Sequence, residues 1–78
     1  MPKRSITIKG HRTSIALENE FWTVLDETAA ARRISLPALV AEIDRLRLKQ
    51  TPTPGLASAL RIFALDEARR SGVGHKAG

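Results

Sequence analysis

The 78-residue chain contains no cysteine and no tyrosine, and its aromatic residues are one tryptophan and two phenylalanines. Without cysteine, neither a disulfide nor a thiolate-bound metal can stabilise the fold. A chain this short buries only about 60% of the surface that its unfolded form exposes, so dimerisation is the common remaining source of stability. The sequence therefore predicts one small domain that forms a homodimer and needs no cofactor.

The chain also lacks long hydrophobic runs, and it lacks acids near its start. No apolar run approaches the ~18 residues of a membrane span, and the first residues do not resemble the apolar segment of a secretory signal peptide. Lys3, Arg4, Lys9 and Arg12 all precede the first acid, Glu18, and the net charge is +5. A basic end of this kind favours a polyanionic partner. We therefore expect a cytoplasmic protein that does not bind a membrane.

Groups suited to catalysis or metal binding are missing as well. No carboxylate and histidine are grouped as an acid–base pair would require. The two histidines, His11 and His75, do not predict a metal site. The strand-like stretch 11–17 has no aromatic residue on which single-stranded RNA could stack. The chain is therefore not expected to be an enzyme, and an RNA-binding module is a disfavoured but open alternative.

Hydrophobic and polar residues alternate from His11 to Leu17, as in a β-strand with one buried face. The predicted core face consists of Thr13, Ile15 and Leu17. The opposite face, which carries no acid, consists of Arg12, Ser14 and Ala16. Because a strand must pair its backbone groups, we expect the same stretch of a second copy to pair with it, antiparallel about a two-fold axis.

Residues 1–10 are predicted to be a basic arm or an extra strand. Ile6 and Ile8 alternate with polar residues, which makes Ser5–Lys9 a weaker strand candidate. A turn at Lys9-Gly10 would let this strand form a hairpin with residues 11–17 inside one chain, although Lys-Gly is a weaker hairpin signal than Asn-Gly. The hairpin is thus an open alternative to pairing between two chains.

Three helices are predicted after the strand. The first covers about 19–32 with Asn19 as its N-cap, the second begins just past the N-cap Ser35, and the third covers about 56–70. The apolar stripe of the second helix includes Leu46, and Ile62 and Leu65 are expected to broaden the stripe of the third. Residues 71–78 are predicted to be a disordered tail. The predicted dimer core consists of Ile15, Leu17, Phe21, Trp22, Leu25, Leu39, Val40 and Ile43.

One strand followed by two helices resembles the ribbon-helix-helix DNA-binding proteins, and particular stretches resemble a bacterial subfamily of short members. These stretches are Arg4-Ser5-Ile6-Thr7-Ile8, Gly10 to Glu18, Phe21-Trp22, Ile34-Ser35-Leu36, Ala38 to Asp44 and Ser58-Ala59-Leu60-Arg61. The resemblance covers roughly 4–70. Arg33 and Gly55 depart from the subfamily, which tends to have glycine and asparagine there.

The resemblance implies a mainly α fold with one β-strand: an intertwined homodimer with an intermolecular antiparallel β-ribbon, built from residues 11–70, with an extra C-terminal helix. In this fold the ribbon enters the major groove. The implied base-reading residues are Arg12, Ser14 and Ala16. The implied phosphate contacts are the start of the second helix at Ser35, Leu36 and Ala38, and the basic segment at Lys3, Arg4, Lys9 and His11. Each assignment has an alternative. The strand face that carries Arg12 could simply be solvated, Ser35 could be an ordinary helix cap, and the basic N-terminal segment could be an arm that only increases solubility.

The function implied by the resemblance is a sequence-specific regulator of transcription, acting as a repressor in the bacterial nucleoid. The alternative is an antitoxin-like protein that neutralises a partner protein and regulates its own operon. An antitoxin would use a long partner-binding segment after its DNA-binding domain. Only about eight residues follow the third helix, which disfavours this alternative.

Overall fold

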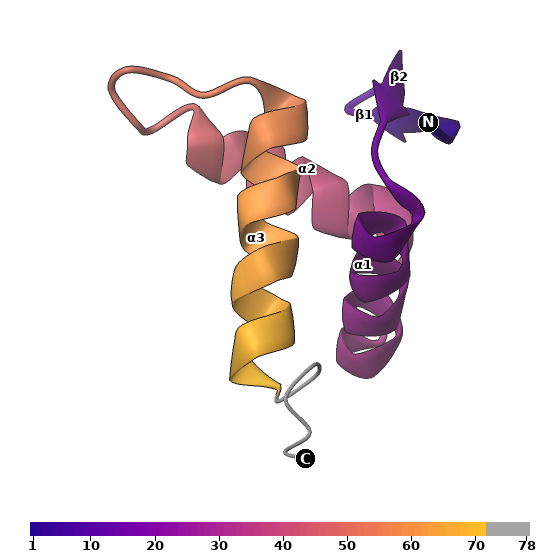
Figure 1. Cartoon of the computed structure of the whole chain (residues 1–78). Coiled ribbons are helices and arrows are strands. Elements are labelled where there is room, and N and C mark those ends of the chain that lie inside the picture. Colours follow the sequence, from indigo (N-terminus) through magenta and orange to yellow (C-terminus); the bar gives the residue numbers. More distant parts are fainter. Residues whose placement is uncertain (72–78) are drawn as a thin grey trace.

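A computed structural model of the chain describes residues 1–71, and it contains two strands followed by three helices (Figure 1). The elements are β1 (Lys3–Ile8), β2 (His11–Ala16), α1 (Asn19–Arg32), α2 (Leu36–Arg47) and α3 (Leu56–Arg70). None of the helices in this part of the chain is long and apolar enough to cross a membrane. The predicted tail, apart from Ser71, lies outside the described residues.

The two strands form an antiparallel hairpin within one chain. The turn residues Lys9 and Gly10 both have positive φ, at 51° and 82°. Two positive φ values are typical of the type I′ turn, whose twist matches that of paired strands. The expectation of a single strand was therefore wrong, and the hairpin alternative is confirmed. Pairing with a second copy, which would use the other edge of β2, stays a prediction.

Helix α1 begins without a side-chain cap and ends on a left-handed arginine. Glu18, not Asn19, occupies the N-cap position, and its side chain makes no cap hydrogen bond. At the other end Arg33 is left-handed, with φ 59° and ψ 41°. The Arg33 N–H donates to the Ala30 carbonyl oxygen at 3.1 Å. The Ile34 N–H donates to the Ala29 carbonyl oxygen at 3.0 Å. This pair of bonds is a Schellman motif, and it turns the chain sharply into α2.

Helices α1 and α3 lie side by side and run in the same direction, and α2 packs against both (Figure 1). The sheet packs on α2 through β1. The largest fully buried side chains are Leu17, Trp22, Leu25, Leu39, Val40 and Leu60. Because α3 contributes Leu60 to this core, it belongs to the folded unit.

The side chains predicted to form a dimer core pack within a single chain. Seven of the eight are buried there, and Phe21 is half-buried. Three predicted stripe residues are instead exposed: Leu46 at 44%, Ile62 at 59% and Leu65 at 49%. Leu46 lies at the edge of the stripe on α2. At about 100° per residue, Ile62 and Leu65 lie more than about 120° around α3 from the line of Leu56, Leu60 and Phe63, so they are outside the stripe that faces the core.

Candidate nucleic-acid interface

The hairpin register decides which side chains share the outer face of the sheet. Residues directly opposite in an antiparallel pair point to the same side. The outward pairs are Lys3 with Ala16, Ser5 with Ser14, and Thr7 with Arg12. The predicted base-reading residues on β2 thus share the outer face with three side chains of β1, of which Ser5 and Thr7 carry hydroxyls. The sequence carried this signal, since Ser5 and Thr7 alternate with the buried Ile6 and Ile8.

The outer face is polar and unengaged. All of its side chains are exposed except that of Ala16, which is half-buried. It carries two cations, three hydroxyls and no acid. Among the hydrogen bonds and ion pairs within residues 1–71, none uses the side chains of Lys3, Ser5, Thr7, Arg12 or Ser14. The face can therefore donate hydrogen bonds to a ligand without breaking internal contacts.

Arg4, which was expected to contact phosphate, lies on the opposite face of the sheet. It is opposite Ile15 in the register, on the side that packs against the helices. Its two terminal nitrogens donate to the carboxylate oxygens of Asp26 at 3.0 and 3.1 Å. Its guanidinium also stacks over the ring of Trp22. Arg4 is thus engaged with α1 and is not grouped with the outward cations.

The other two predicted contacts of the N-terminal segment lie at the end of the hairpin. Lys9 is exposed in the turn. His11 is also exposed, but it is opposite Ile8 and therefore on the side of the sheet that faces the helices. Lys9 is accordingly better placed than His11 to extend the outer face.

The start of α2 has fewer free donors than expected. The Ser35 hydroxyl accepts a hydrogen bond from the Ala38 N–H at 3.1 Å, so that donor is occupied. Pro37 has no N–H to offer. The N–H groups of Ser35 and Leu36 have no acceptor within residues 1–71. A phosphate at this helix end would therefore meet two N–H groups and the positive end of the helix dipole.

An ion pair fixes the passage from β2 to α1. Arg61 on α3 donates from Nε to the Glu18 carboxylate at 2.9 Å. This hydrogen bond, helped by one from the backbone of Glu18, lowers the pKa of the Glu18 carboxyl below its ordinary value of 4.5. Arg61 is thereby engaged inside the protein. Across the described chain, histidine and acidic side chains form no group that could hold a metal ion.

Comparison with known proteins agrees with this architecture. A family model described as a ribbon-helix-helix domain matches residues 1–68, which includes the hairpin and nearly all of α3. No curated protein and no solved structure matches the chain.

Proposed function

Because the chain belongs to the ribbon-helix-helix family, we propose that it is a transcriptional regulator, acting as a repressor, that binds specific sequences in double-stranded DNA. The fold is a DNA-binding regulatory fold, and not one typical of enzymes. The observation that carries the proposal is the outer face of the hairpin, which presents cations and hydroxyls with no acid and no internal partners.

The chemistry of the outer face suits base edges in the major groove. Arg12 can donate two hydrogen bonds to the O6 and N7 atoms of guanine. Ser14 can donate or accept, and Ala16 can contact only the methyl group of thymine. Arg12 should therefore specify a base most strongly and Ala16 least.

We further propose that two copies pair through the free edges of their β2 strands, as expected from the sequence. The dimer would then present four strands in the order β1, β2, β2 and β1. Strands lie about 4.8 Å apart, so the outermost strands would be about 14 Å apart. The major groove is only about 12 Å wide. The central β2 strands would therefore enter the groove, and the outward Lys3, Ser5 and Thr7 of β1 would lie over the phosphates at its walls.

The antitoxin alternative receives less support. An antitoxin could also bind its partner through the third helix, but in α3 Leu60 is fully buried and Leu56 and Phe63 pack against the core. These three side chains cannot bind a toxin unless α3 leaves the fold, and the large apolar side chains that α3 does expose are Ile62 and Leu65. We therefore retain the regulator as the proposed function.

The test is selection of bound sequences from a random duplex pool with the purified full chain. Enrichment of a defined site, symmetric if the dimer binds two half-sites, is the expected outcome. A pool that remains random after repeated selection would contradict sequence-specific binding.

A further inference from the structure

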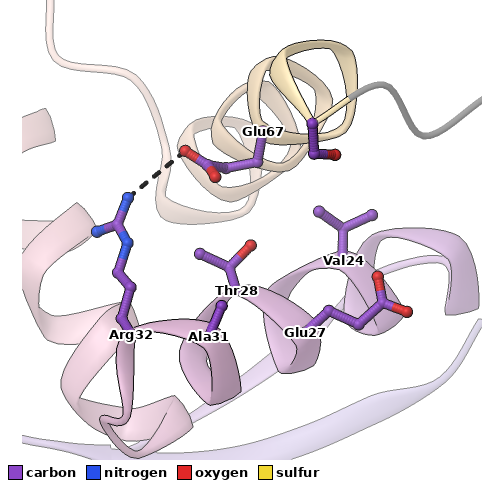
Figure 2. Close-up of a pocket in the computed structure, with 7 residues that line it drawn as sticks. Val24, Glu27, Thr28, Ala31, Arg32 and Glu67 are labelled. Carbon is purple, nitrogen blue, oxygen red and sulfur yellow. Dashed lines mark hydrogen bonds and ion pairs between the residues drawn. The ribbon is translucent and has the colours of Figure 1, made fainter.

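A groove lies on the surface between α1 and α3, and Figure 2 shows the residues that line one part of it. It consists of two adjoining cavities of about 290 and 410 Å³, which share Val24 and Glu27 in their linings. Its apolar side chains are Phe21, Val24, Ala31, Ala64, Leu65 and Ala68, and the three alanines among them are small. We call it the α1/α3 groove. Small side chains along two neighbouring helices let a third helix approach closely.

The groove contains a polar group without an internal partner. Thr28 is only 9% exposed and lines the groove, and Figure 2 shows its hydroxyl directed toward α3. No hydrogen bond formed within residues 1–71 uses this hydroxyl. No side-chain nitrogen or oxygen in the described residues is both fully buried and unpaired, so the Thr28 hydroxyl keeps its contact with solvent and is open to a ligand in the groove.

The rim of the groove is acidic in a chain that is otherwise basic. Glu20 and Glu27 line it from α1, and Glu67 lines it from α3. Arg32, the cation at this rim, is shared between Glu67 at 3.5 Å and Glu42 at 3.7 Å. Glu20 and Glu27 take part in no ion pair with the rest of residues 1–71. An occupant of the groove should therefore bring positive charge to these two carboxylates.

The spacing of the two carboxylates suggests the form of the occupant. Glu20 and Glu27 are seven residues apart, about 10.5 Å along α1. Two basic residues seven positions apart on a helix lying along the groove would have the same spacing. The groove extends from Glu20 to Ala31 on α1, about 17 Å, which matches three helical turns. A compact small molecule would fill only part of that length.

We propose that the α1/α3 groove binds an amphipathic helix of a partner protein, with Lys or Arg seven residues apart beside small and apolar residues. Docking of such a helix in a groove is a recurring mode of recognition. The helices of a second copy do not match this pattern, because α1, α2 and α3 contain no two basic residues seven positions apart. The acidic rim repels DNA, so DNA does not compete for the groove. The proposal does not depend on the DNA-binding function.

The test uses a displayed library of amphipathic helical peptides, selected for binding to the full chain. The expected result is enrichment of peptides with basic residues seven positions apart. Failure to enrich any peptide, or enrichment of peptides without this pair, would overturn the proposal. Peptides shorter than two turns that bind equally well would indicate a compact ligand site instead.

Matched variants then locate the site on the protein. Glu27→Lys should weaken the selected peptide about tenfold or more, because like charges meet across the interface. Asp66→Lys makes the same change on an exposed part of α3 outside the groove and should have little effect.

Two neighbouring alanines give a steric control. Ala30 and Ala31 are both exposed, but only Ala31 lines the groove. Ala31→Leu should block the peptide, and Ala30→Leu should not. Equal effects of the two changes would overturn the proposal. So would conversion of a dimer into a monomer by Ala31→Leu, because the groove would then be an interface between copies of this chain.

Discussion

The guanidinium carbon of Arg4 lies 4.6 Å from the centroid of the Trp22 ring, and both of its terminal nitrogens bond the carboxylate of Asp26. Neighbouring cations at the start of the chain thus face opposite ways. Arg4 ties β1 to α1, whereas Lys3 points outward from the sheet. We therefore expect Arg4 to stabilise the fold and Lys3 to contact DNA.

Arg4→Ala should lower the free energy of unfolding by about 1 kcal/mol, because an exposed cation–π contact and an exposed ion pair each contribute up to about that much. It should leave the salt dependence of DNA binding unchanged. Lys3→Ala should reduce the salt dependence of DNA binding and should have little effect on the free energy of unfolding. Urea denaturation and duplex titrations across a salt series measure both quantities. If Arg4→Ala reduced the salt slope as much as Lys3→Ala does, Arg4 would be a phosphate contact.

Arg33→Gly should stabilise the fold by about 1 kcal/mol. Position 33 has φ 59° and ψ 41°, a conformation that strains a side chain with a Cβ and suits glycine. Ala30→Gly is the control, because the same residue type inside α1 should cost about 1 kcal/mol. Chemical denaturation of the two variants should shift the midpoint in opposite directions, and a loss of stability in Arg33→Gly would contradict the left-handed cap.

Lys9→Asn should stabilise the hairpin and weaken DNA binding. Asn-Gly is the preferred pair for a turn with two positive φ values, so we expect a gain of about 0.5 kcal/mol. If Lys9 contacts a phosphate, its replacement should reduce the salt slope by about one for each phosphate that Lys9 neutralises, equally for all duplexes. Thermal denaturation and binding titrations measure the two effects. A variant with wild-type salt dependence would show that Lys9 does not contact phosphate.

Glu18 should make stability depend on pH. Its hydrogen bond with Arg61 lowers its pKa below 4.5, the value expected in the unfolded chain. The ion pair therefore stabilises the fold above that pH, and this contribution is lost as the pH falls through the lower pKa of the folded state. Glu18→Gln should be less stable at neutral pH and should lose less stability on acidification. Identical acid sensitivity of wild type and variant, measured by urea denaturation, would contradict this role.

Much of the local structure could be predicted from the sequence. The alternation of 11–17 indicated the correct buried and exposed sides of β2, and Ser35 followed by Pro37 marked the start of α2. The tight link at Arg33 was also predictable, because the chain had to turn there between two helical patterns. Each of these features is determined by residues close together in the sequence, so local sequence patterns were sufficient to predict it.

Long-range features were harder to predict. The pairing of β1 with β2 depended on Lys9 accepting a positive φ, which lysine disfavours. The partner of Arg4, Asp26, lies 22 residues away along the chain. The α1/α3 groove exists only because α3 returns alongside α1, and no local periodicity fixes that arrangement.

The sharpest test of the proposed function measures Arg12→Ala binding to a selected duplex and to an unrelated one across a salt series. We expect a cost of about 1–3 kcal/mol on the selected duplex, a weaker preference at one base position per half-site, and much less change on unrelated DNA. Arg45→Ala removes the same charge from an exposed site at the end of α2 and should not alter the preference. An equal loss of affinity for both duplexes in Arg12→Ala would make Arg12 a phosphate contact and contradict base reading by the sheet.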